Sequence, residues 1–255
     1  MTTWDPQQYL KFADHRLRPA LDLLARIGAQ EPGAVFDLGC GAGNVTKLLA
    51  ERWPMARVTG VDGAMPMLEK ARAAAPRIAF VQAELASWTA PAPAGVVYSN
   101  AALHWLDDHE TLFPRLMAQL APGGTLAVQM PRNHRAASHS TMLAAAEAGP
   151  WKAKLANVRG IHAVHDPDAY YRILAPLALR LDIWECEYLQ VLEGENPVVE
   201  WTKGSGLRPY LDALDDAAKK GFLAAYAERI AAAYPPQPDG RTLFPFRRIF
   251  IVAER

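Results

Sequence analysis

Three alternating glycines, Gly39, Gly41 and Gly43, follow a short apolar run that contains Asp37. Glycine lets the backbone approach a ligand closely, and the start of a following helix presents free amide groups. Asp37 precedes the first glycine by two residues, and a second acid, Asp62, ends the next strand-like run. An acid in that place can accept hydrogen bonds from both ribose hydroxyls of a nucleoside. The pattern therefore predicts a nucleoside-binding turn at the end of a buried strand.

The spacing of the glycines argues against a dinucleotide cofactor. The dinucleotide fingerprint is G-x-G-x-x-G, with its third glycine inside the helix, whereas Gly43 is followed by Asn44-Val45-Thr46. Glu84 adds another carboxylate after the third strand-like run, and a pyrophosphate would be repelled by so acidic a rim. S-adenosylmethionine has no phosphate and is positive at its sulfonium and amine, so the acids and the spacing favour it.

The elements that must position these residues alternate between strands and helices. Such alternation predicts right-handed βαβ units and a parallel sheet. We expect helices at 6–27, 44–52, 65–75 and 109–120, and strands at 34–38, 57–61, 78–82, 96–99 and 125–130.

After Pro131 the alternation stops. We expect helical pieces over 133–176 and 196–234, and strands at 181–184, 188–191 and 242–253. The fold class expected is α/β: one domain, 1–255, with a doubly wound, mostly parallel seven-stranded sheet, helices on both faces and a helical cap. The core would comprise about 30–131, 177–192 and 242–255, and the cap 1–28, 132–176 and 195–235.

Composition narrows the function classes. The 255 residues include 27 Lys and Arg and 27 Asp and Glu, so the net charge is zero and no nucleic-acid or membrane partner is expected. The two cysteines, Cys40 and Cys186, are too far apart in sequence to indicate a disulfide framework. No apolar run is long enough to span a bilayer, and no signal peptide is evident. We therefore expect a cytoplasmic protein. His162, His165 and Asp166 lack a further partner at ligand spacing, so no metal is expected. Oligomeric state is not encoded in these features.

The chain resembles the class I methyltransferases at Asp37–Gly43, Asp62 and Asn100, and more closely the trans-aconitate 2-methyltransferase family. The resemblance covers nearly the whole chain, and the segment 135–163 matches poorly. The segments that carry it are Trp4-Asp-Pro, Tyr9-Leu10, Arg16-Leu-Arg18-Pro19, Asn100-Ala-Ala-Leu-His104-Trp105-Leu106, Leu126-Ala-Val-Gln129-Met130-Pro131, Asp182-Ile-Trp184, Thr202-Lys-Gly-Ser-Gly206-Leu-Arg208-Pro209 and Phe250-Ile-Val-Ala253.

The resemblance implies that S-adenosyl-L-methionine is the cofactor and S-adenosyl-L-homocysteine the product. It also implies a contact for each part of the cofactor. The methionine end would lie against Asp37 and the loop of Gly39, Gly41 and Gly43, the ribose against Asp62, the adenine against Ala64, Met65, Glu84 and Leu85, and the amine against the backbone of Asn100.

The reaction implied is O-methylation of a carboxylate of trans-aconitate or a similar small polycarboxylic acid, giving a monomethyl ester. Such an acid has a pKa near ~4, so it is already ionised and needs no catalytic base. The protein must instead orient the polyanion and neutralise it.

Arginine suits that task because its planar fork binds carboxylates in bidentate fashion. Arg208 is the first candidate, since it lies in the turn-like segment Gly206-Leu-Arg-Pro. Arg132 follows a strand end, where ligands bind in such folds, and Arg16 and Arg18 lie on the opening helix. The further candidates are Arg247 and Arg248, with Gln129, Trp105, Tyr9, Asn133, His104 and Trp151 completing the pocket.

Two alternatives remain open at this point. The acceptor can be a hydroxylated small molecule, in which case a base is needed and His104 is the candidate. The chain can also bind S-adenosylmethionine without transferring its methyl group.

Overall fold

The computed structural model describes residues 13–158 and 164–255, and their side chains from residue 17 onward. Seven strands form one sheet in the order β3-β2-β1-β4-β5-β7-β6. The pairs among β1 to β5 are parallel, and β7 runs antiparallel to β5. This confirms the expected doubly wound, mostly parallel sheet. The strands are β1 (Ala34–Leu38), β2 (Arg57–Asp62), β3 (Ala79–Gln82), β4 (Ala94–Asn100), β5 (Leu120–Pro131), β6 (Arg180–Leu192) and β7 (Thr242–Glu254).

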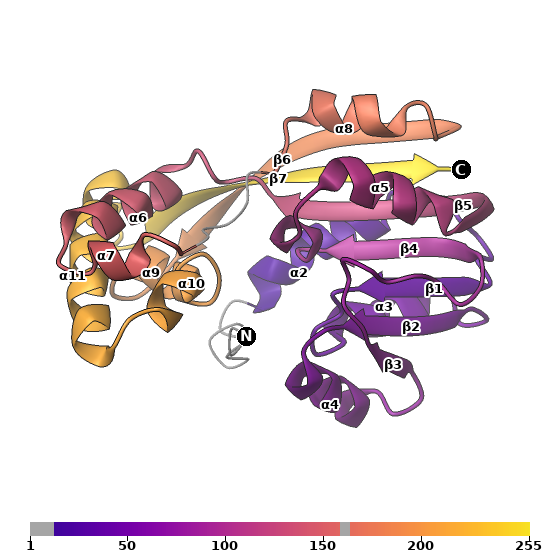
Figure 1. Ribbon diagram of the computed structural model, residues 1–255, viewed down its shortest axis with the longest axis horizontal. Helices are drawn as coiled ribbons and strands as arrows, with labels where there is room; N and C mark the ends of the chain where they lie inside the picture. The colour runs from indigo at the N-terminus through magenta and orange to yellow at the C-terminus, as the bar shows by residue number, and fades with distance from the viewer. Residues whose placement is uncertain (1–12, 159–163) are drawn as a thin grey trace. The chain divides into compact units, whose positions relative to one another are not determined.

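The described helices precede these strands or lie between them along the chain (Figure 1). None of them combines the length and apolar character that crossing a bilayer requires. They are α2 (Ala13–Leu24), α3 (Asn44–Arg52), α4 (Met65–Ala74), the 3-10 helix η1 (Leu103–Trp105), α5 (His109–Ala118), α6 (Ala137–Ala148), α7 (Lys152–Leu155), α8 (Pro167–Leu174), α9 (Pro197–Lys203), α10 (Arg208–Asp212) and α11 (Asp216–Ala233).

The chain divides into two compact units. The sheet unit comprises Arg16–Pro131, Val164–Cys186 and Arg248–Arg255. Among the described residues, the helical unit comprises 13–15, 132–158 and 187–247. The strands β6 and β7 contribute residues to both units.

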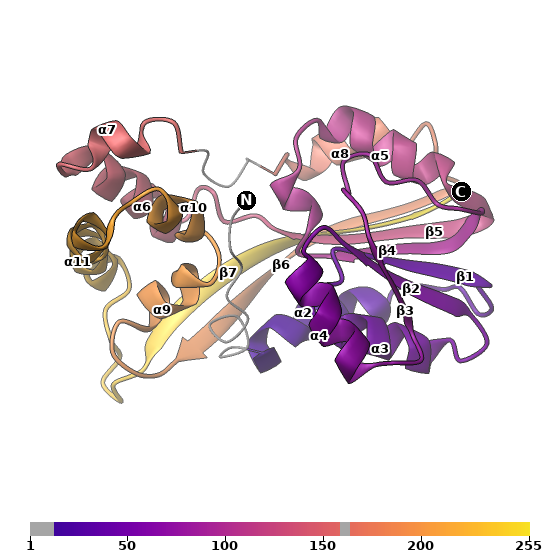
Figure 2. The same ribbon diagram turned by 60° about the horizontal axis from the view of Figure 1, so that its bottom comes forward.

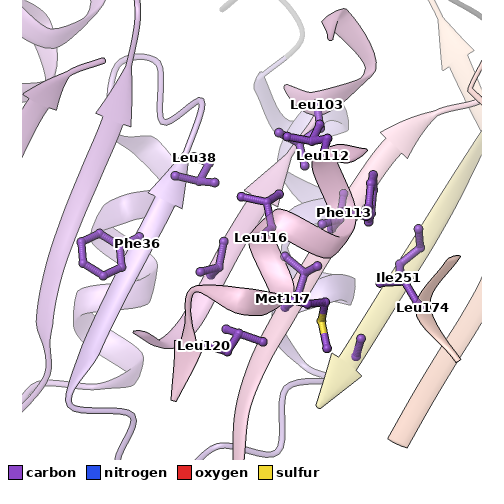
Figure 3. Close-up of a cluster of buried hydrophobic side chains, with 14 of the residues drawn as sticks. Phe36, Leu38, Leu103, Leu112, Phe113, Leu116, Met117, Leu120, Leu174 and Ile251 are labelled. Atoms are coloured by element: carbon purple, nitrogen blue, oxygen red, sulfur yellow. The ribbon is translucent and has the colours of Figure 1, made fainter. Parts of the chain in front are cut away.

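In the sheet unit, helices cover both faces of the sheet, with α5 and α8 on one face and α2 and α3 on the other (Figure 2). β1 is buried along its whole length, as a central strand between two helical layers must be. The face under α5 and α8 holds the main apolar core (Figure 3). Its members include Phe36, Leu38, Leu103, Leu112, Phe113, Leu116, Met117, Leu120, Leu174 and Ile251.

The opposite face of the sheet is fixed to α2 by a buried hydrogen bond. The Tyr98 hydroxyl in β4 donates to the Ala20 carbonyl over 2.8 Å, and Leu23 of α2 is buried. This helix was expected to belong to the cap, together with 132–176. The structure instead assigns α2 from Arg16 onward, and α8, to the sheet unit. α8 contributes Tyr170 and Leu174 to the main core, and α2 is bonded to β4 through Ala20.

The helical unit has a separate core in which α11 packs against α6 and α9. Trp201, Phe222 and Tyr226 are all fully buried there. Trp151, expected to line a pocket, is also in this core, where its indole Nε1 donates to the Ala145 carbonyl over 2.8 Å.

Among the described elements, the differences from the expected bounds include three of more than one or two residues or of strand number. The described part of the opening helix ends at Leu24. β5 begins at Leu120, so the Pro122-Gly-Gly segment lies inside that strand. The two short strands expected at 181–184 and 188–191 form one continuous strand, β6, because ladder pairing carries the backbone through the polar residues between them.

Candidate functional site

The turn after β1 is joined to the turn after β2 by the Asp62 carboxylate. The amide of Gly41 donates to Asp62 Oδ2 over 2.8 Å, and the amide of Ala64 donates to Asp62 Oδ1 over 2.8 Å. Each carboxylate oxygen has more than one lone pair, so Asp62 can still accept from a ligand hydroxyl. These bonds hold the acid at the carboxyl end of β2, where the sequence placed a ribose contact.

Gly39 shows why this turn needs glycine. Its φ is +77°, and a Cβ added there would lie 2.1 Å from the Cβ of Ala102. The turn after β1 therefore contacts the segment after β4 directly. At Gly41 an added Cβ would meet nothing within 4 Å, so the backbone of the turn is open on that side.

Asp37 lies beneath this turn and is only 2% exposed. The Thr46 hydroxyl in the first turn of α3 donates to Asp37 Oδ2 over 2.6 Å. Burial raises the pKa of Asp37 to about 7, against the hydrogen bond from Thr46, which lowers it, and together with the charge of Asp62, which raises it further. The carboxyl group is thus poised to change its charge when a cation arrives nearby.

Thr46 itself was not expected as a site residue. Its position in the first turn of the helix after the glycines is a usable signal, because a hydroxyl there faces back toward the preceding strand. Cys40, in the same turn, is buried, and burial raises the pKa of its thiol, which fits the small buried residue expected from the sequence.

The acid and apolar residue expected beside adenine lie against these turns. Glu84 Oε1 is 3.7 Å from the place a Cβ on Gly63 would take, and Leu85 Cδ1 is 3.6 Å from that place on Gly39. Ala64 is half-buried and Met65 is exposed at the start of α4.

A row of polar side chains crosses the ends of three neighbouring strands. Asn100 of β4 is directly opposite Gln129 of β5, and Arg248 of β7 is opposite the neighbouring Pro131. Residues opposite each other in a sheet point to the same face. Arg248 Nη1 donates to Gln129 Oε1 over 3.2 Å, and both side chains are buried, with exposures of 4% and 0%.

Among the described residues, the amide groups of this polar row leave two buried atoms without a protein hydrogen-bond partner. They are the buried acceptor Asn100 Oδ1 and the buried donor Gln129 Nε2. Buried polar atoms are almost always hydrogen-bonded, so both point to a polar ligand. η1 follows at the same edge, where the buried His104 ring is 4.8 Å from the ring of half-buried Trp105.

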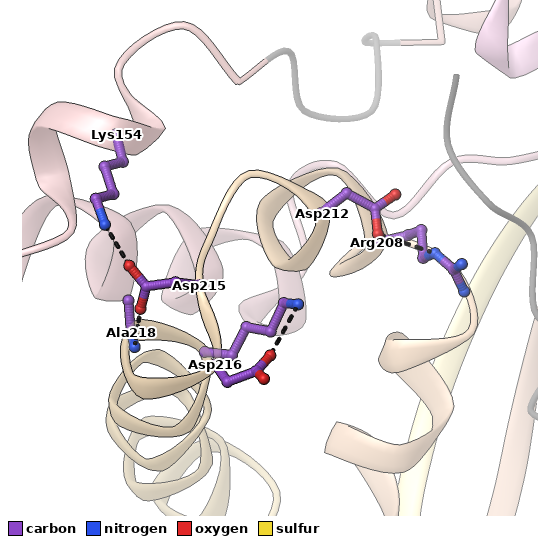
Figure 4. Close-up of polar contacts among 7 residues, drawn as sticks. Lys154, Arg208, Asp212, Asp215, Asp216 and Ala218 are labelled. Carbon is purple, nitrogen blue, oxygen red and sulfur yellow. Dashed lines mark hydrogen bonds and ion pairs between the residues drawn. The ribbon is translucent and has the colours of Figure 1, made fainter.

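The other expected acceptor-binding residues are dispersed. Arg208 begins α10 in the helical unit, where its Nε lies 3.4 Å from Asp212 Oδ1 (Figure 4). Arg132 of the same unit is half-buried, and its amide donates to the Arg247 carbonyl. Arg18 is exposed on α2. The side chain of Arg16 and the whole of Tyr9 lie outside the described residues.

Arg247 and Asn133, also expected to bind the acceptor, both have protein partners in the helical unit. Arg247 is exposed and lies 3.5 Å from Glu187, so its charge is paired with a protein carboxylate. Asn133 Oδ1 accepts from the Arg247 amide over 2.7 Å, which makes Asn133 a backbone contact of β7.

These features fit S-adenosylmethionine. The turn at Gly41 is open, Asp62 retains acceptor capacity for hydroxyls, and Asn100 Oδ1 is a buried acceptor at the same strand edge. The carboxylates of Asp37 and Asp62 lie at the turn, and they suit a cofactor that is positively charged and has no phosphate.

Comparison with known sequences identifies the family. A family model described as a methyltransferase domain matches residues 35–124. A trans-aconitate 2-methyltransferase of Azoarcus sp. (strain BH72) is 51% identical over 255 residues, covering 100% of both chains. The trans-aconitate 2-methyltransferases of Rhodopseudomonas palustris (strain BisB18) and Streptomyces avermitilis are 48% and 47% identical, covering 99% of this chain and 99% and 97% of theirs. The chain belongs to the trans-aconitate 2-methyltransferase family. It is an S-adenosylmethionine-dependent methyltransferase, and S-adenosylmethionine is its cofactor.

Solved structures share the fold at low sequence identity. The YcgJ protein from Bacillus subtilis has a TM-score of 0.60 at 14% identity, covering 95% of this chain and 98% of that one. A Haemonchus contortus phosphoethanolamine N-methyltransferase 2 in complex with S-adenosyl-L-methionine has a TM-score of 0.55 at 16% identity, covering 92% and 52%.

Proposed function

We propose that the enzyme methylates one carboxylate of trans-aconitate or a similar small polycarboxylic acid and releases a monomethyl ester. The printed names of its relatives support this acceptor. The observation that carries the proposal is the buried pair formed by Gln129 and Arg248 at the end of β5.

The pair offers hydrogen-bond donors to an anion. Arg248 is a buried guanidinium, and its Nη1 donates to the amide oxygen of Gln129 over 3.2 Å. Gln129 Nε2 is a buried donor with no partner among the described residues. A carboxylate held here accepts from the amide and the guanidinium together, and charge-assisted bonds of this kind are the strong ones.

The chemistry asks the protein to hold and aim the acceptor. When bound, S-adenosylmethionine supplies a methyl group on a sulfonium sulfur, and its transfer to a carboxylate oxygen gives a methyl ester and S-adenosylhomocysteine. The acceptor has a pKa near ~4 and is already ionised, so no side chain need remove a proton. Correct orientation alone can contribute ~7–11 kcal/mol to lowering the barrier.

The remaining expected site residues are part of the proposal. Cofactor contacts are assigned to Asp37, Gly39, Gly41, Gly43, Asp62, Ala64, Met65, Glu84, Leu85 and Asn100, and acceptor contacts to Gln129, Trp105, Tyr9, Arg16, Arg18, Arg132 and Arg208. Arg208 needs its own test, because Asp212 already balances part of its charge.

The reaction is tested by following methyl transfer from radiolabelled S-adenosylmethionine to trans-aconitate, cis-aconitate, citrate and isocitrate. We expect a base-labile ester on trans-aconitate. At saturating S-adenosylmethionine, which removes any effect of Asp37 on cofactor affinity, the rate should be flat between about pH 6 and 8 because the acceptor is ionised there. Transfer only to hydroxylated acceptors, with a rate that rises near pH 7, would overturn the proposal and assign a base role to His104.

Acceptor binding is tested with Arg248→Met. We expect the KM for the acid to rise roughly 10- to 100-fold, because a hydrogen bond to a charged group is lost. Arg180→Met is the matched control, since Arg180 is an exposed arginine on the adjacent strand β6. Equal KM values for the Arg248 variant and the unmodified enzyme would remove this pair from the acceptor site. Arg208→Ala, measured in the same assay, decides whether Arg208 contributes.

A further inference from the structure

The connection between β3 and β4 carries Glu84 and Leu85 but contains no helix among its described residues. It begins with a turn in which the Ser87 amide donates to the Glu84 carbonyl over 3.2 Å. The turn is anchored at its far end by Trp88, which is buried against Phe36 of β1 with ring centroids 5.2 Å apart.

One arginine of α5 holds the carbonyl groups of this turn. Arg115 Nη1 donates to the Trp88 carbonyl, and Nη2 donates to the carbonyls of Ala86 and Leu85 over 2.7 and 3.2 Å. One turn of helix later, Gln119 Oε1 accepts from the amide of Ala90 over 2.9 Å. Arg115 and Gln119, at the end of α5, thus hydrogen-bond to both ends of the stretch 85–90.

These three hydrogen bonds require the guanidinium group of an arginine. Backbone carbonyls outside a helix or sheet need donors, and a planar group with several N–H bonds can satisfy three of them at once. The ammonium of lysine is a compact point charge on a flexible stem and cannot span three carbonyls in this way. No motif in the sequence marks Arg115, because its partners are 27 to 30 residues away.

The turn that Arg115 holds lies beside the turns that follow β1 and β2, where the cofactor is proposed to bind. Leu85 Cδ1 lies 3.6 Å from the Cβ position on Gly39, and Glu84 Oε1 lies 3.7 Å from that on Gly63. We propose that Arg115, assisted by Gln119, is a positioning residue that holds the stretch 84–90 in place for the adenine end of S-adenosylmethionine. The inference concerns the cofactor and is independent of which acceptor the enzyme uses.

The test measures binding of S-adenosylhomocysteine to the full chain by calorimetry, and amide hydrogen exchange of the protein without ligand. For Arg115→Lys we expect the Kd to rise about tenfold, as loss of one or two net hydrogen bonds predicts. We also expect faster exchange of the amides at 85–90, with unchanged exchange in β1. In the methyl-transfer assay, KM for S-adenosylmethionine should rise while kcat at saturation stays the same.

Arg172→Lys is the matched control, since Arg172 is an exposed arginine of the sheet unit that pairs with Asp168 on α8. Gln119→Met removes the acceptor of the Ala90 amide and leaves the Arg115 guanidinium in place, although it also removes the 3.4 Å bond from Gln119 Nε2 to the Arg115 carbonyl. It serves as the second variant if the first fails to fold. Wild-type affinity in both variants would overturn the inference. So would faster exchange spread evenly over β1 and β4, because that result would show a general loss of stability.

Discussion

At the scale of single residues, the buried pair of Asp37 and Thr46 makes the charge of the candidate site depend on pH. The carboxyl group is buried with one hydrogen bond, and its raised pKa means that a proton is held more tightly in the folded than in the unfolded chain. A buried acid therefore favours the fold when it is neutral and opposes it when it is charged.

This gives a prediction on pH and stability. The folded pKa of Asp37 is about 7 and the ordinary value is 3.8, so the free energy of unfolding should fall as pH rises through that window. The slope contributed by one such proton is about 1.4 kcal/mol per pH unit. Asp37→Asn should flatten the profile, measured by chemical denaturation from pH 4 to 8.

Asp168→Asn is the control for that profile. Asp168 is exposed, and its hydrogen bond with Arg172 lowers its pKa below the ordinary value of 3.8. Any contribution of Asp168 to the pH dependence of stability therefore lies below the pH range measured. Identical slopes in the Asp37 variant and the unmodified enzyme would show that this carboxyl group is ionised throughout.

At the scale of elements, the turn after β1 works because it touches the segment after β4. Gly39→Ala would place a Cβ 2.1 Å from Ala102 and would also strain a positive φ. We expect weaker binding of S-adenosylhomocysteine by at least tenfold, together with a loss of stability of more than about 1 kcal/mol.

Gly33→Ala separates these two effects. Gly33 has a φ of +65°, but an added Cβ there meets nothing within 4 Å, so only the backbone strain applies. Calorimetry of both variants measures the difference. Equal losses of affinity would mean that contact with Ala102 is unimportant.

A buried histidine connects two other elements of the sheet unit. His109 lies 3.0 Å from the Leu103 carbonyl through Nε2 and 2.7 Å from the Tyr170 hydroxyl through Nδ1. Because a carbonyl only accepts, Nε2 must carry a proton, and the neutral ring can then accept from Tyr170 at Nδ1. The ring thereby joins η1 to α8.

Acid should weaken this connection. Burial lowers the pKa of His109, and the charge of His165 lowers it further, while the Leu103 carbonyl and Glu110 act in the opposite direction. A lowered histidine pKa gives stability that is present above about pH 6.5 and lost as pH falls below it. The protection factors of the α8 amides, which correct exchange for its intrinsic dependence on pH, should fall below pH 6.5, and His109→Gln should reduce that fall. A variant with the full wild-type dependence would move the effect to another group.

At the scale of the whole molecule, the two units have separate cores. Phe222 is fully buried in the helical unit, and Phe222→Ala should destabilise that unit by about 3–5 kcal/mol through loss of packing. Because the proposed cofactor contacts lie in the sheet unit, the Kd for S-adenosylhomocysteine should change little. Amide exchange of α11 and β1 measures the two units separately. Equal loss of protection in both would show that the molecule unfolds as one cooperative body.

Much of the fold followed from local patterns in the sequence. Apolar runs of strand length and helical spacing predicted the parallel strands, because burial between two helical layers demands such runs. The glycines after β1 and the acid after β2 were also readable, since a tight turn and a strand end each impose a residue type. Their roles toward S-adenosylmethionine remain predictions.

Only the tertiary structure could show which side chains far apart in the sequence contact one another. Arg248 and Gln129 are 119 residues apart in sequence, and only the antiparallel pairing of β7 with β5 makes them neighbours. The same applies to Arg115, whose hydrogen bonds to the stretch 85–88 depend on how α5 packs. The sequence could name six arginines as candidates for the acceptor site. Burial is a property of the packed chain, so only the structure distinguished buried Arg248 on β7 from Arg208, which lies 3.4 Å from Asp212.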